Sequence, residues 1–293
     1  MRFATLFKLP AVVVRHRELL WSFIWRDLKA RYEGSLLGRL WPILNPLIMC
    51  LVYYFVFAVI LGMKMTDRGY EQNEDSSLMG LFIISGILPW LAIGDSLTRC
   101  TGVVLENANL VKKIAFPSQL LPVYAVAVNM IYFLLGLTLF LLARLIFFYD
   151  LDYLDAGGVS QTIHGLPDCW PMLLLIIPLQ AIFTIGLGLF LGAFNIFIRD
   201  TSQLIPLILQ LWFFTTPIVY SAHLIHDNLP DFAYLMQINP IYHLMEVYRS
   251  ALLFPEAGAP WFSLGIFAGC AVLVFLPGYA FFLKTRGRFA DEL

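Results

Sequence analysis

Few residues of this 293-residue chain combine the types and the spacing that catalysis requires. Four of the five histidines, His164, His223, His226 and His243, fall in or near predicted outer loops, and no H-E-x-x-H or G-x-S-x-G motif is present. The four cysteines are also scattered without a C-x-x-C pair, so we expect no metal site and no redox chemistry. No G-x-x-x-x-G-K-[ST] phosphate loop occurs either, so the chain should not bind ATP in the usual P-loop manner.

Charged residues inside long apolar stretches are the next candidates for chemistry. Asp95 and Arg99 are four residues apart, which places them on one face of a helix, and we favour a structural ion pair over a transport site. Arg144 lies at the end of another apolar stretch and is expected to extend its guanidinium to the outer interface. An ion-coupled carrier would hold carboxylates deep in several spans, and this sequence shows essentially none. The energy for any transport must therefore come from elsewhere.

The elements that position these residues are predicted to lie in a membrane. Hydrophobic residues make up 60% of the chain and charged residues only 13%, and the mean hydropathy is +0.78. Soluble domains carry about 25% charged residues, so the solvent of this chain must be largely lipid. No tract of Lys and Arg interleaved with aromatic residues indicates a nucleic-acid surface.

The apolar runs predict an all-α integral membrane protein with six transmembrane helices, because about 20 apolar residues span a bilayer core. The predicted spans cover residues 40–61, 78–97, 120–148, 172–198, 204–220 and 261–283. A cleavable signal peptide is not expected, since the first long apolar run starts only near Leu40.

The distribution of basic residues predicts the orientation. With the N-terminus inside, 15 of the 19 basic residues fall in cytoplasmic segments, as the positive-inside rule requires. Residues 66–77 and 150–170 would then be outside, and both are acidic. Residues 101–118 and both termini would be cytoplasmic.

Three stretches do not span. Residues 15–33 predict a basic amphipathic helix with tryptophans on its apolar face, which would lie in the membrane interface; the alternative is a cap packed on the bundle. Residues 104–116 predict a short cytoplasmic helix that docks into a groove on another protein, with a solvated loop as the alternative. Residues 221–260 carry four prolines and an apolar run too short to cross twice, so we expect re-entrant helices on the outer side.

Aromatic residues, 15% of the chain, gather in the first and fifth predicted spans. Flat amphipathic rings suit the apolar faces and hydroxyl rims of sugars, although aromatic side chains also fill membrane cores and interfacial belts. The candidates for lining a path are Tyr53, Tyr54, Phe57, Trp212, Phe213, Phe214 and Tyr220.

Four segments carry a family resemblance. They are WRDLKARYEGSLLGRLWPILNPL (25–47), GILPWLAIGDSLTRCTGVVLENANLVKKIAFPSQLLP (86–122), FNIFIRDTSQLIPLILQLWFFTTPIVY (194–220) and INPIYHLMEVYRSALL (238–253). Together, and in this order, they resemble ABC-2-type permeases that export polysaccharides, with O-antigen and teichoic-acid exporters nearest. The resemblance extends over nearly the whole chain, so residues 1–293 are read as a single transmembrane domain.

The resemblance implies a transporter subunit and not an enzyme. It implies a homodimer bound to two separate ATPase subunits, which would hold ATP and magnesium, in the inner membrane of a bacterium. The substrate would be a polysaccharide on an undecaprenyl-diphosphate lipid, with O-antigen favoured over teichoic acid, capsule, or another lipid or drug. A membrane-embedded glycosyltransferase or a passive channel would be an alternative of another class.

The resemblance also assigns residue roles. The ATPase-coupling residues would be Glu106, Asn107, Leu110, Val111, Lys112 and Lys113. The helix over 15–33 would be an interface or gate helix, and the turn at Leu37 and Gly38 would lie where lipid-linked substrate enters. Arg31 and Arg39 flank this turn, and the planar donor fork of arginine suits a diphosphate; the alternative is anchoring to anionic headgroups. No role follows for the long acidic segment 150–170.

Overall fold

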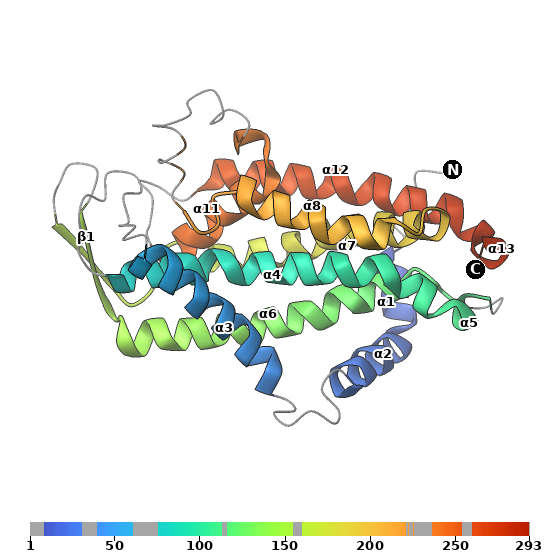
Figure 1. Cartoon of the computed structure of the whole chain (residues 1–293), viewed down its shortest axis with the longest axis horizontal. Coiled ribbons are helices and arrows are strands. Elements are labelled where there is room, and N and C mark those ends of the chain that lie inside the picture. Colours follow the sequence, from blue (N-terminus) through green and yellow to red (C-terminus); the bar gives the residue numbers. More distant parts are fainter. Residues whose placement is uncertain are drawn as a thin grey trace.

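The protein is a bundle of long helices (Figure 1). The computed structural model describes residues 9–30, 40–60, 76–112, 116–154, 160–220, 222, 225, 236–253 and 260–292. The helices in chain order are α1 (Leu9–Arg15), α2 (Arg17–Ala30), α3 (Trp41–Tyr54) with a π-helical continuation η3 (Phe55–Ile60), α4 (Ser76–Glu106), α5 (Ala108–Val111), α6 (Leu120–Phe147), η4 (Trp170–Met172), α7 (Leu173–Phe197), α8 (Thr201–Thr215), α11 (Pro240–Leu252), α12 (Trp261–Thr285), η5 (Arg286–Arg288) and α13 (Phe289–Glu292).

Four of the described helices are long and apolar enough to cross a membrane. They cover Met79–Glu106, Leu120–Phe147, Trp170–Phe197 and Trp261–Glu292. A helix of 28 residues is about 42 Å long, which exceeds the bilayer core of about 30 Å. The first and fifth predicted spans correspond to shorter apolar helices, Leu47–Phe57 and Thr201–Thr215. The prediction of a multi-pass helical membrane protein is confirmed, and four of the six predicted spans are found at full length.

Helices α4, α7 and α12 approach one another closely through glycines. A Cβ atom on Gly278 of α12 would lie 2.2 Å from the backbone oxygen of Gly186 on α7. A Cβ atom on Gly192 of α7 would lie 2.8 Å from the backbone oxygen of Cys100 on α4. Small residues allow backbones in a membrane to pack this closely. We call these three helices the glycine seam.

The short helix α11 is held inside the bundle. It contacts α4, α7 and α12, and its residues from His243 to Leu252 are all buried. The Tyr248 hydroxyl donates to Gln180 Oε1 of α7 at 2.6 Å, and Gln180 Nε2 donates to the Pro89 oxygen of α4 at 3.2 Å. This helix lies in the predicted re-entrant segment 221–260, of which residues 222, 225, 236–253 and 260 are described.

The prediction of an all-α fold is wrong in one segment. Strands β1 (Asp150–Leu154) and β2 (Ser160–His164) pair antiparallel, with Asp150 opposite His164 and Leu154 opposite Ser160. The strands contain Tyr153, Thr162 and Ile163, residue types that favour extended structure. The acidic segment that had no predicted role is therefore a β-hairpin.

Candidate functional site

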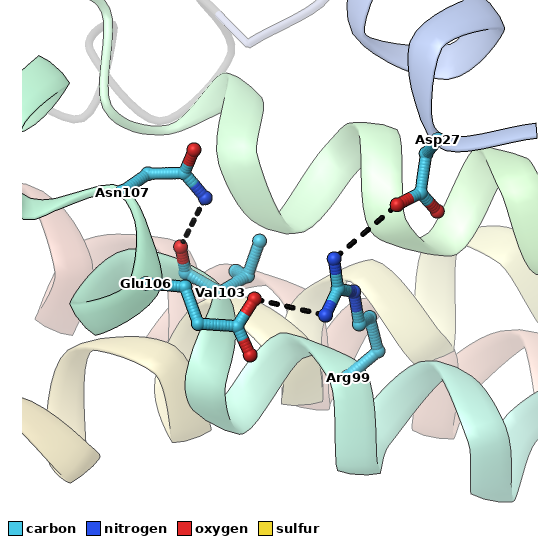
Figure 2. Close-up of polar contacts among 5 residues, drawn as sticks. All are labelled: Asp27, Arg99, Val103, Glu106 and Asn107. Atoms are coloured by element: carbon cyan, nitrogen blue, oxygen red, sulfur yellow. Dashed lines mark hydrogen bonds and ion pairs between the residues drawn. The ribbon is translucent and has the colours of Figure 1, made fainter. Parts of the chain in front are cut away.

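An arginine on α4 joins the end of this helix to α2 (Figure 2). Arg99 Nη1 lies 2.8 Å from Glu106 Oε2, two turns further along α4. Arg99 Nη2 lies 3.2 Å from Asp27 Oδ1 on α2. The guanidinium therefore connects the end of α4 to a helix that is 72 residues away in the sequence. We call these three residues the Arg99 bridge.

Small and polar neighbours shape the bridge on the α4 side. Glu106 passes over Gly102, where a Cβ atom would lie 3.0 Å from Glu106 Oε1 and would crowd the carboxylate. Beyond Glu106 the helix stops, because Asn107 Nδ2 donates to the Val103 oxygen at 2.8 Å and its backbone turns. The Leu110 amide then donates to the Asn107 oxygen at 2.9 Å, which starts α5. The bridge thus ends where the chain turns into α5.

The bridge is half accessible to solvent. The side chains of Asp27, Arg99 and Glu106 are 13%, 32% and 50% exposed. Exposed ion pairs contribute about 0–1 kcal/mol because water and salt screen them. The bridge therefore adds little stability, and its significance is that one guanidinium links α2 to the turn before α5.

Helix α2 has one packed face and one open face. Phe23 is buried and stacks on Tyr124 of α6, with ring centroids 5.3 Å apart. On the opposite face Trp21 and Trp25 stack on each other and are 59% and 51% exposed. The Lys29 ammonium lies 5.2 Å from the Trp25 ring. The helix therefore packs on the bundle as a cap and also presents tryptophans beside basic residues, as an interfacial helix does.

The segment predicted as a docking helix over 104–116 is built differently. Helix α4 continues through Glu106, and only Ala108–Val111 forms the separate α5. Leu110 and Val111 are half-buried against the core, whereas Asn109 and Lys112 are exposed. Lys113 lies outside the described residues.

The C-terminal helix α13 lies against α5 at the same end of the bundle (Figure 1). Its Phe289 is fully buried and meets Phe282 of α12 edge to face, with centroids 5.2 Å apart. Arg286 Nη1 donates to Gln119 Oε1, before α6, at 3.2 Å. The exposed residues of α5 and α13 thus form one surface, which we call the α5 surface.

Five of the seven predicted path residues gather where α3, α4 and α8 meet. Tyr53 stacks on Phe57 at 6.3 Å and lies 5.4 Å from Phe213, which contacts Phe214 at 5.1 Å. Trp212 meets Trp90 of α4 edge to face at 6.0 Å, and its Nε1 donates to Asn239 Oδ1 at 3.0 Å.

The other two predicted path residues lie at the edges of this aromatic cluster. Tyr54 is beside Gly80, and the Tyr220 hydroxyl donates to the Phe214 oxygen at 2.8 Å. Sequence reasoning missed Trp90, because Phe82, the other aromatic residue of its predicted span, is eight residues away and the two form no cluster in the sequence. The rings pack mainly on one another, and Phe214 has the widest open face of the rings from α8, at 54% exposed.

Two further charged candidates behave differently from expectation. Arg99 was predicted to pair along its own helix with Asp95, and its observed ion pairs run to Asp27 and Glu106. Arg144 was predicted to extend to the interface, and that prediction is wrong because its side chain is fully covered. The candidates for the place where substrate enters, Arg31, Leu37, Gly38 and Arg39, lie outside the described residues.

Comparison with known proteins gives a consistent result over the whole chain. Residues 18–253 match the ABC-2 type transporter family. The chain is 30% identical over 289 residues to the O-antigen export system permease protein RfbA of Myxococcus xanthus, covering 98% of this chain and 99% of that protein. It is 27% identical over 268 residues to the protein of the same name from Klebsiella pneumoniae, covering 92% of each. The polysialic acid transport protein KpsM of Escherichia coli is 22% identical over 262 residues, covering 89% of this chain and 90% of that protein.

Proposed function

The chain belongs to the ABC-2 type transporter family, and on that basis we propose that it is the permease subunit of an ATP-driven polysaccharide exporter. The proposed substrate is a glycan of the O-antigen class on undecaprenyl diphosphate, moved from the cytoplasm across the bacterial inner membrane. The observation that carries this proposal is the similarity to an O-antigen export permease over 98% of the chain. Two copies of the chain and two ATPase subunits would form the exporter.

The ATPase would dock on the α5 surface. The sequence contains no phosphate loop, so ATP has to be bound by a partner. The α5 surface offers exposed Asn109 and Lys112 beside the exposed C-terminal acidic residues Asp291 and Glu292. Because Leu110 is half-buried against the core, an aspartate there would disturb the fold as well as docking. Lys112→Glu alters an exposed side chain and should leave the fold intact. We therefore expect less ATPase to co-purify with that variant.

The Arg99 bridge would carry movement of the docked end to α2. A displacement of α5 moves Glu106, and the ion pairs of Arg99 with Glu106 and Asp27 couple that displacement to the interface helix. Arg99→Met should therefore leave ATP hydrolysis by the complex intact and reduce export at least tenfold. Glu18→Gln, which removes an exposed carboxylate from the same helix α2, is the matched control and should export normally. Normal export by Arg99→Met would refute this role.

Substrate would enter beside the turn at Leu37 and Gly38. There Arg31 and Arg39 are proposed to bind the diphosphate, since arginine matches phosphate oxygens with two parallel donors. Arg31→Lys and Arg39→Lys keep the charge and lose the fork, so export should fall although anchoring to anionic lipid is preserved. If both lysine variants export at the wild-type rate, the basic residues serve only as anchors.

The glycan would pass the aromatic cluster of α3, α4 and α8. This path is supported by the aromatic contacts at one place in the bundle, which involve Tyr53, Phe57, Trp212 and Phe213. The side chain of Phe214 is exposed beside them. A second copy of the chain would face this open side and close the path. Phe214→Ala should then slow export with little loss of stability, because the side chain is largely exposed.

Deletion and complementation test the proposed function. A host lacking its own O-antigen permease should regain surface glycan when this chain is expressed with a partner ATPase of such an exporter. The chain alone and the ATPase alone should fail. The similarity to KpsM at 22% identity makes capsule the second candidate, so a capsule-permease deletion provides the parallel test. Rescue of the capsule strain alone would reassign the substrate.

A further inference from the structure

Arg144 is a buried cation without a hydrogen-bond partner. It lies in the last turn of α6, which ends at Phe147, and its side chain is 0% exposed. Within the described part of the chain, its Nε, Nη1 and Nη2 atoms all lack a hydrogen-bond partner. The next three residues, Leu145, Ile146 and Phe147, are exposed, so the covered guanidinium lies close to the end of the bundle.

This arrangement is unfavourable unless an anion completes it. Arginine keeps its charge in proteins and carries five N–H donors. A buried charge needs a partner to offset its lost hydration, and removal of an unpaired one is stabilising. Asp150, the first residue of β1, is close enough to act electrostatically on Arg144, but its carboxylate is 2.7 Å from His164 Nδ1. Within the described residues no hydrogen bond joins the two side chains, and the donors of Arg144 are open to a ligand.

The depth of Arg144 indicates which anion is available. Helix α6 is about 42 Å long and exceeds the hydrocarbon core of about 30 Å by about four residues at each end. A residue three positions before its last residue then lies at the level of the lipid headgroups. The anionic groups concentrated at that level are phosphates, and the guanidinium fork matches phosphate oxygens.

We propose that Arg144 binds a phosphate group at the outer end of the bundle and receives the diphosphate of the exported lipid-linked glycan. The proposal rests on the proposed function for the identity of the lipid and on the predicted orientation for the side. The site is closed in this structure. Strand β1 of the hairpin begins three residues after the end of α6.

Lipid binding to the purified permease tests the proposal. The chain is titrated in detergent with undecaprenyl diphosphate and, separately, with phosphatidylglycerol, and bound lipid is counted by native mass spectrometry. Arg144→Met should weaken undecaprenyl diphosphate binding about tenfold, the effect of losing one charge-assisted contact, and phosphatidylglycerol binding less than twofold. Arg199→Met removes the same charge from an exposed site near the other end of α7 and should change neither lipid more than twofold.

Stability separates this role from a structural one. Arg144→Met should melt at the wild-type temperature or above, because it removes an unpaired buried charge, whereas a structural arginine would lower the melting temperature on removal. Arg144→Lys, which keeps the charge, is the second variant and should bind undecaprenyl diphosphate about threefold more weakly than the wild type.

The outcomes are distinct. Equal weakening of both lipids by Arg144→Met would keep the phosphate site but overturn its assignment to the exported lipid. Unchanged binding of both lipids, or a lowered melting temperature with unchanged binding, would overturn the site itself. Export by the wild-type complex is scored separately, so a failed Arg144 site and a failed exporter assignment give different results.

Discussion

The glycine seam and the pair α3 and α8 are both apolar, yet they pack by different means. In the seam, Gly186, Gly192 and Gly278 let backbone atoms of α4, α7 and α12 meet directly. Helix α8 instead packs through single side chains such as Leu209 and Phe213, and it exposes Leu204, Leu207, Ile208, Leu211 and Phe214. Contacts between backbones cannot be rearranged by rotamer changes, whereas an exposed apolar face takes whatever lipid or protein lies against it. The seam is thus the fixed scaffold, and α3 and α8 carry the apolar faces that remain exposed on the single chain.

The largest effect is expected from a substitution at Gly278. A methyl group there would lie 2.2 Å from the Gly186 oxygen, so Gly278→Ala must separate α7 from α12. We expect a cost of about 3 kcal/mol or more and a loss of folded protein, measured as the monodisperse fraction and the melting temperature in detergent. Gly269→Ala on the same helix is the control, because nothing lies within 4 Å of its new methyl group. An equal loss of folded protein in the two variants would contradict the assignment of the glycine seam as the rigidly packed part of the bundle.

A smaller effect is expected at the hydrogen bond that ties α11 to the seam. Tyr248→Phe removes the donor to Gln180 Oε1 and leaves a buried acceptor without it, which should cost about 1–2 kcal/mol. The double variant with Gln180→Met tests the pairing. If the two groups act together, the double variant should lose less stability than the sum of the losses of the two single variants. A fully additive pair, or a Tyr248→Phe protein as stable as the wild type, would show that α11 is held by apolar packing alone.

The smallest effect is expected on the open face of α8. Leu211→Ser alters a side chain that is 68% exposed and should change the stability of the single chain by less than about 0.5 kcal/mol. The same substitution at Leu209, which is 8% exposed on the packed face, should cost about 3 kcal/mol. Thermal unfolding in detergent compares the two. A larger loss at Leu211 than at Leu209 would reverse the assignment of the two faces.

The positions of the long helices could largely be predicted from the sequence, because an apolar run of spanning length is a local signal. The run over 120–148 corresponds to α6 at Leu120–Phe147, and the run over 172–198 to α7 at Leu173–Phe197. The second span was predicted to end near Leu97, but α4 continues to Glu106, since no proline interrupts it there and polar residues in its last turns still permit a helix.

The candidate site was less predictable, because its contacts are remote in sequence. The pairing of Arg99 with Asp27 joins residues 72 positions apart, so a search for helical i, i+4 spacing finds only Asp95. The covered position of Arg144 likewise depends on how α6 is packed and not on its own sequence. The hairpin was missed because its short strands are hidden among aspartates that suggest a solvated loop.

Transport by the purified complex tests the central claim most directly. This chain and its ATPase are reconstituted in vesicles that contain lipid-linked O-antigen, and appearance of the glycan on the far side is followed with a membrane-impermeant lectin. The account predicts glycan transfer that requires ATP, the ATPase subunit and this chain together. Transfer without ATP, or ATP hydrolysis with no transfer of any lipid-linked glycan, would contradict it.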